Sequence, residues 1–99
     1  MVKIERVGEV NDKSATEVYE AAVEAFEAEG FEVWKERPIA WLVMVRTTIE
    51  GCSVDGNLAA RATTPTSYIL TLTSEEAAEE KLAAGADEFI HIFEGILSV

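Results

Sequence analysis

The run from Ile39 to Ile49 is the longest stretch of the sequence in which polar residues are almost absent. It is too short to span a bilayer, and its β-branched and aromatic residues favour a strand over a helix. Successive side chains of a strand point to opposite faces, and both sets are apolar in the first half of this run. The sequence therefore predicts an inner strand that is covered on both faces.

The turn before this strand leaves two registers open. Residues 31–36 alternate like a strand, and Arg37–Pro38 has the composition of a turn that leads into the next strand. A turn of two residues places Trp34 opposite Trp41, whereas a turn of three residues places Trp34 opposite Leu42. In either register Trp34 is a large apolar group on a strand face that is otherwise polar.

The first third of the chain predicts an edge strand followed by a helix. Charged residues alternate with valine and isoleucine over Val2–Val10, and Gly8 marks a possible bulge in that strand. Ser14 and Glu17 have the spacing of a capping box, which begins a helix. Residues 15–29 then carry apolar and acidic side chains on opposite sides, and a glycine closes the helix.

The segment after Ile49 predicts two more strands. The dipeptide Asp55–Gly56 is a strong hairpin signal, and it precedes a small and polar strand over Leu58–Thr63. The residues Tyr68–Thr73 alternate clearly and predict the fifth strand.

Residues 87–94 fit either a helix or a strand. An apolar stripe keeps helical phase from Ala78 to Leu97 and passes through Gly85, which predicts one long helix. The alternative is a helix that ends at Gly85 and a last strand over residues 89–93, which also alternate. The unbroken phase favours the long helix, and Ile90 and Ile92 widen its apolar arc enough to predict a second contact there.

These elements predict one α+β domain over residues 1–99, with the order strand, helix, four strands, helix. The economical arrangement is a mostly antiparallel sheet of about five strands with two helices on one face. In the order of its elements, the chain resembles the TATA-binding-protein half-domain and a reduced helix-grip fold. No motif of either family is present.

The charge balance restricts the partners of the chain. There are 19 acidic and 8 basic residues, for a formal net charge of −11. Such a field repels phosphate backbones and anionic lipids, so we expect no binding to nucleic acid or to a membrane surface. Cys52 is the only cysteine and no secretory leader is visible, which predicts a cytoplasmic location.

The sequence assigns no catalytic residue. His91 is the only histidine and falls toward the polar side of the predicted helix, and Cys52 has no basic neighbour to activate its thiol. One cysteine and one histidine fill only half of a zinc tetrahedron. An enzyme remains the third hypothesis, with a cleft between the sheet and the long helix in which carboxylates such as Glu36 or Glu50 act as acid and base.

Carboxylates are the one plentiful functional group, so weak binding of Ca²⁺ or Mg²⁺ is the second hypothesis. Acidic side chains on one helix face diverge into water and make an exchanging site rather than a cage. No other cofactor is predicted. The candidate metal ligands are Glu76, Glu79, Glu80, Asp87 and Glu88.

The leading hypothesis is a binding or assembly module. If the helices shelter only one face of the sheet, the second face of the central strand leaves an apolar patch that is unusual on a monomer. A homodimer, or a complex with another protein, is therefore expected. The predicted partner face consists of Trp34, Trp41, Leu42, Met44, Ile90 and Ile92.

Overall fold

The computed structural model describes residues 1–98, and its elements confirm the predicted α+β class. In chain order they are β1 (Val2–Val10), α1 (Ala15–Ala28), β2 (Glu32–Arg37), the 3₁₀ turn η1 (Pro38–Ala40), β3 (Leu42–Ile49), β4 (Cys52–Arg61), β5 (Thr66–Ser74) and α2 (Glu79–Leu97).

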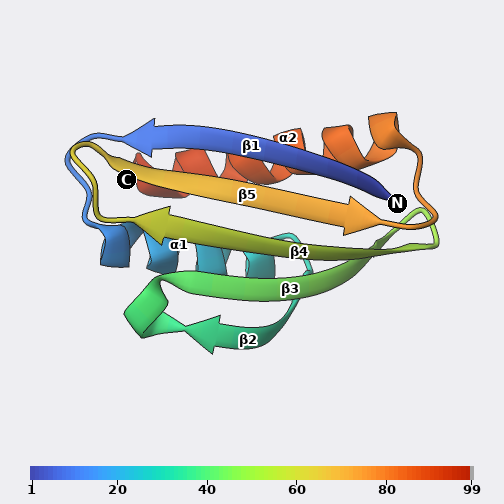
Figure 1. Cartoon of the computed structure of the whole chain (residues 1–99), viewed down its shortest axis with the longest axis horizontal. Helices are drawn as coiled ribbons and strands as arrows, with labels where there is room; N and C mark the ends of the chain where they lie inside the picture. Colours follow the sequence, from blue (N-terminus) through green and yellow to red (C-terminus); the bar gives the residue numbers. More distant parts are fainter. Residues whose placement is uncertain (99) are drawn as a thin grey trace.

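The five strands form one antiparallel sheet in the order β1-β5-β4-β3-β2. Both helices lie behind this sheet in Figure 1, with α1 against β2, β3 and β4, and α2 against β1 and β5. Within residues 1–98, no helix covers the opposite side, which we call the open face. The two-layer arrangement with both helices on one face is as predicted.

Local signals in the sequence set both ends of α1. Ser14 Oγ accepts a hydrogen bond from the backbone N–H of Glu17 at 3.1 Å, and the Glu17 carboxylate accepts one from the backbone N–H of Ser14 at 2.9 Å. This second bond lowers the pKa of Glu17. Gly30 follows α1 with a φ of 81°, which a glycine adopts at little cost. The predicted capping box and glycine cap are both confirmed.

Helix α2 runs without a break through Gly85, so the alternative of a last strand over residues 89–93 is wrong. A Cβ atom at Gly85 would lie 2.8 Å from the Cδ1 atom of Ile49, so the missing side chain lets α2 approach β3. Neither helix in the described part of the chain is long and apolar enough to cross a membrane.

Aromatic rings fill the interior between the sheet and the helices. Phe26 of α1 stacks on Phe89 of α2 with their ring centres 4.1 Å apart, and Phe89 stacks on Phe93 at 5.5 Å. Tyr68 of β5 meets Phe93 edge to face at 5.0 Å. The three phenylalanine side chains are fully buried, and together they join both helices to the sheet.

The hairpin between β3 and β4 lies earlier than predicted. Ile49 pairs with Cys52, so Glu50 and Gly51 form a two-residue turn with φ values of 50° and 83°. The predicted turn residues Asp55 and Gly56 instead lie inside β4. At Gly56 a Cβ atom would meet side chains of neighbouring strands, which explains the glycine by close packing rather than by a turn.

The predicted bulge at Gly8 is absent, because β1 pairs with β5 in unbroken register over Val2–Val10. Gly8 pairs with Tyr68, and a Cβ atom at Gly8 would overlap the Tyr68 ring. The glycine therefore makes room for an aromatic side chain from the next strand, a pairing that shields the bare backbone.

Neither predicted register of the turn after β2 is correct. Pro38–Ala40 forms a 3₁₀ turn and Trp41 adopts a left-handed conformation with φ of 51°, so Arg37 pairs with Leu42 across a four-residue connection. The register also shifts between Val33 and Lys35, which leaves Trp34 at a bulge. Neither the 3₁₀ turn nor the bulge has a signal in the local sequence that separates it from a shorter turn.

Strand β3 is an inner strand, as predicted, since it pairs with β2 and β4. Its coverage differs from the prediction. Val43 and Val45 are fully buried beneath the helices, whereas Leu42 and Met44 lie half-buried on the open face. Only one face of the predicted central strand is therefore covered by the described chain.

Candidate functional site

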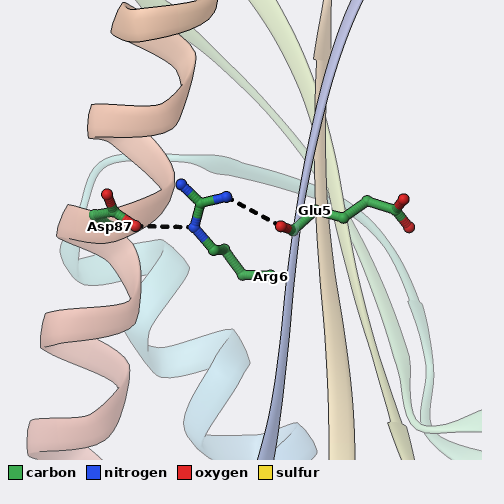
Figure 2. Close-up of polar contacts among 3 residues, drawn as sticks. All are labelled: Glu5, Arg6 and Asp87. Atoms are coloured by element: carbon green, nitrogen blue, oxygen red, sulfur yellow. Dashed lines mark hydrogen bonds and ion pairs between the residues drawn. The ribbon is translucent and has the colours of Figure 1, made fainter.

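Two regions outside the core are candidate binding sites. One is the open face of the sheet, and the other is a pocket at one end of the helix layer. The face of each residue follows from its strand register. Figure 2 shows this alternation of side chains on β1, where Arg6 lies on the α2 side and Glu5 points away on the other side. Arg6 Nε bonds to Asp87 Oδ1 at 2.9 Å, which ties the edge strand to α2.

One row of apolar residues crosses the open face from β1 to β3. Val7 pairs with Ile69, Ile69 pairs with Ala59, and Ala59 pairs with Leu42. Val7 is 71% exposed and the other three are half-buried. We call these four residues the apolar row. Its members come from four adjacent strands, so the row spans most of the width of the sheet.

Trp34 and Met44 extend the apolar surface toward β2. The Trp34 side chain is 42% exposed, and the guanidinium carbon of Arg46 lies 4.6 Å from the centre of its ring. This cation–π contact holds the indole beside β3. Met44 pairs with Lys35 on the same face.

The open face differs sharply in charge from the rest of the molecule. Five of the eight basic residues lie on it but only four of the nineteen acidic residues, so its formal charge is +1 and the remainder of the chain carries −12. The charged residues of this face are Lys3, Glu5, Glu9, Glu32, Lys35, Arg37, Arg46, Asp55 and Arg61.

The structure brings together half of the predicted partner face. Trp34, Leu42 and Met44 share the open face. Trp41 lies on the helix side, where its indole N–H donates to Thr16 Oγ1 of α1 at 3.2 Å.

The other predicted members, Ile90 and Ile92 of α2, are half-buried and pack against the core. Sequence reasoning missed Val7, Ala59 and Ile69, although the alternation of β5 placed Ile69 opposite the buried leucines.

The second region is a pocket of about 370 Å³ between the end of α1, the end of β3 and the first half of α2, which we call the end pocket. Its apolar wall is formed by Phe31 and Ile49, and hydroxyl groups come from β3. The lining residues that matter chemically are Glu29, Phe31, Ile49, Glu50, Lys81 and Glu88.

Glu29 has a buried carboxyl oxygen and a raised pKa. Its Oε1 atom is buried and has no hydrogen-bond partner among residues 1–98. Burial, and then the nearby charge of Glu88, raise the pKa of Glu29 above its ordinary value. Glu29 is also the C-terminal cap of α1, where the helix dipole disfavours a carboxylate. A raised carboxyl pKa in a pocket is a physical mark of a functional group.

A lysine on α2 neutralises the other wall of the pocket. Lys81 Nζ lies 3.0 Å from Glu50 Oε2, and this hydrogen bond raises the pKa of Lys81. Glu50 was one of the two carboxylates in the enzyme hypothesis. In the structure its carboxylate is paired with Lys81. The other, Glu36, is exposed beside Tyr19, away from this pocket.

The candidate metal ligands do not converge. Within residues 1–98, no three side chains of the His, Cys, Asp and Glu types are placed to hold a metal ion. Asp87 is paired with Arg6, and Glu88 lines the end pocket. Glu76, Glu79 and Glu80 are exposed around the start of α2. Weak binding of Ca²⁺ or Mg²⁺ remains a prediction, without a preformed cage to support it.

Comparison with known proteins places the fold but not the function. No protein-family model and no curated protein matches the sequence. Among solved structures, the crystal structure of Ara h 8.0201 matches with a TM-score of 0.64 and 10% identity, over 98% of this chain and 95% of that one. The ZhuI aromatase/cyclase from Streptomyces sp. R1128 matches with a TM-score of 0.54 and 16% identity, over 98% and 84%. At these identities the likeness shows a shared α+β fold and nothing about function.

Proposed function

We propose that this chain is a self-associating binding module in which two copies pack their open faces together. The observation that carries the proposal is the charge contrast: a face of formal charge +1, crossed by the apolar row, on a molecule whose remaining surface carries −12. The net charge of the remaining surface makes two copies repel each other there, so the open face is where they approach at least cost. The proposed setting is the cytoplasm, where the single Cys52 stays reduced.

The sheet order makes this face complementary to itself. In the order β1-β5-β4-β3-β2, β4 lies in the middle. A two-fold axis parallel to the strands, placed over β4, stacks β1 of one copy over β2 of the other and β5 over β3. Such a symmetric interface uses the same patch on both copies. Within the apolar row, Ile69 then lies over the second copy's Leu42 and Ala59 over its Ala59, while Val7 lies over Arg37 at the edge.

In two rows of the sheet, the residues on the edge strands β1 and β2 have opposite charges, and the two-fold axis brings these residues together. Following the register across all five strands, Lys3 on β1 shares a row with Glu32 on β2. In the next row, Glu5 on β1 is matched by Lys35 on β2. The two-fold operation therefore places Lys3 over the second copy's glutamate and Glu5 over its lysine. Complementary charges of this kind fix the register of an interface.

The size of the face is sufficient for a dimer of modest affinity. Strands about 4.8 Å apart, with about 3.3 Å per residue, make a five-stranded face on the order of 600 Å² per copy. Pairing two such faces buries on the order of 1,200 Å² in total, at the lower end of specific interfaces. Sheets that pack face to face in this way adopt a nearly aligned orientation.

Size-exclusion chromatography with light scattering tests the proposal at high micromolar concentration. We expect the mass of a dimer, and a monomer under these conditions contradicts the proposal. Ile69→Asp places a charge in the apolar row and should weaken association by at least roughly tenfold. Ile39→Asp is the matched control, because Ile39 is 96% exposed and lies in η1 outside the sheet. Equal weakening by both variants also argues against the open face.

A charge swap tests the two-fold geometry itself. Lys35→Glu should weaken the dimer, because it places two glutamates opposite each other across the interface. Adding Glu5→Lys to the same chain restores an opposite pair and should restore association. Glu24→Lys on α1 makes the same change in net charge on an exposed helix face and serves as the control. If the control restores association as well as Glu5→Lys does, only the net charge matters and the proposed pairing is wrong.

A further inference from the structure

The end pocket has a chemical character that the self-association proposal does not use. It lies among the end of α1, the end of β3 and the first half of α2, and no member of the apolar row lines it. A volume of about 370 Å³ is in the range of small-ligand sites. One side is apolar, with Phe31 and Ile49, and the polar groups stand beside it.

Within the described residues 1–98, the two acids Glu29 and Glu88 form no ion pair. The ion pairs within residues 1–98 join Arg6 to Asp87, Arg46 to Asp55 and Lys81 to Glu50, and none includes Glu29 or Glu88. The buried Oε1 atom of Glu29 makes no hydrogen bond in the same part of the chain. A buried polar atom without a partner is unfavourable, so a ligand that donates a hydrogen bond to this carboxyl group would be stabilised there.

A cation suits this position better than a neutral donor. The charged lining residues Glu29, Glu50, Lys81 and Glu88 have a formal charge of −2. The carbonyl end of α1 adds partial negative charge beside Glu29. The Glu29 carboxyl group needs only a rotation about its last side-chain bond, which is a soft torsion, to present either oxygen to the cavity.

We propose that the end pocket binds a small primary amine with an apolar body. The ammonium group lies between the Glu29 and Glu88 carboxylates, and the body lies against Phe31 and Ile49. The Lys81–Glu50 pair forms the wall at the end of β3, so this wall offers no free carboxylate to a second cationic group. The ligand class is therefore a monoamine rather than a diamine or an inorganic cation.

The first test is an NMR titration of the intact chain at pH 7 with benzylamine, with benzyl alcohol as the neutral comparison. We expect benzylamine to shift the amides of Phe31, Ile49, Gly85 and Glu88 as a compact set, and benzyl alcohol to bind at least roughly tenfold more weakly because it lacks the charge. Shifts spread evenly over the acidic surface, or equal binding of both compounds, would overturn the proposal.

Variants locate the site. Glu29→Gln and Glu88→Gln should each weaken benzylamine binding by roughly tenfold, the scale of one charge-assisted hydrogen bond. Glu24→Gln removes an equal charge from the exposed side of α1 and should leave the affinity unchanged. If Glu24→Gln weakens binding as much as Glu29→Gln, the amine responds to overall charge and the end pocket is not its site. Because the apolar row is remote from this lining, Ile69→Asp should leave benzylamine binding intact even if the dimer is lost.

Discussion

The two faces of the sheet differ in burial and in residue type, although the same five strands form both. On the helix side of β5, Thr66, Tyr68, Leu70, Leu72 and Ser74 are all buried. The alternate residues on the open side are half-buried and mostly hydroxylic. The inner face is fixed by packing against two helices. The outer face contributes little to that packing, so its apolar row and its charges are free to be selected for contact with another molecule.

The largest expected effect lies in the inner layer. Phe89→Ala removes the ring that stacks on both Phe26 and Phe93, and all three side chains are fully buried. Truncation of such a ring typically lowers the free energy of unfolding by about 3–5 kcal/mol. Denaturant unfolding followed by circular dichroism measures the change. A loss below about 1 kcal/mol would mean that the aromatic stack is not the centre of the core.

A smaller effect is expected at the edge strand. Gly8→Ala forces the new methyl group against the Tyr68 ring, which is held in place by Phe93. Overpacking of this kind costs about 1–3 kcal/mol. Gly95→Ala is the matched control in α2, because nothing lies within 4 Å of its Cβ position. There the same change should stabilise the helix by up to about 1 kcal/mol. If thermal unfolding shows that both variants are equally stable, the contact between Gly8 and Tyr68 is not tight.

The elements that were predicted correctly have local sequence signals, whereas the feature that was missed depends on packing between strands. The helix starting at Ser14, the long helix through Gly85 and the fifth strand were all predicted, because each has a local signal in capping residues or periodicity. The turn at Glu50–Gly51 was missed, because Asp55–Gly56 has the stronger turn composition. Packing decided that case, since Gly56 lies against side chains of both neighbouring strands.

The candidate sites depend on register, which a single sequence specifies poorly. Leu42 and Met44 belonged to the predicted partner face, and they share the open face in the structure. Val7, Ala59 and Ile69 join them only once three further strands are aligned. The end pocket was unpredictable for a similar reason: Glu29 and Glu88 are far apart in sequence, and their proximity is a result of how α1 and α2 cross the end of β3.

The effect of the end pocket on stability is tested by pH. The folded protein raises the pKa of Glu29 through burial and then through Glu88, so the native state binds its proton more tightly than the unfolded chain does. That contribution to stability is present at low pH and is lost as pH rises through the native pKa. Glu29→Gln removes the carboxylate and should raise the free energy of unfolding at pH 7 by up to about 1 kcal/mol, since the group is partly solvated.

The pH dependence of the difference provides the control for Glu29→Gln. At a pH below the ordinary carboxyl pKa, wild type and variant should be almost equally stable, because Glu29 is then neutral in both states. Denaturant titrations at pH 3.5 and pH 7 measure this directly. A stability difference that is the same at both values would show that the substitution acts through packing and not through charge.

The smallest stability effect should come from the open face, and it is the sharpest test of the contrast. Ile69 and Leu70 are adjacent in β5 but point to opposite sides of the sheet. Leu70→Ala should cost about 2–5 kcal/mol, because that side chain is fully buried.

Ile69→Thr keeps the β-branched shape that strands favour, so in dilute monomer it should cost only about 0.5 kcal/mol. At high micromolar concentration the cost of Ile69→Thr should grow, because the substitution also removes the stabilisation that a dimer gains from its second copy. Unfolding curves collected over a hundredfold range of concentration separate the two contributions. A cost for Ile69→Thr that does not depend on concentration would mean that the open face is simply solvated.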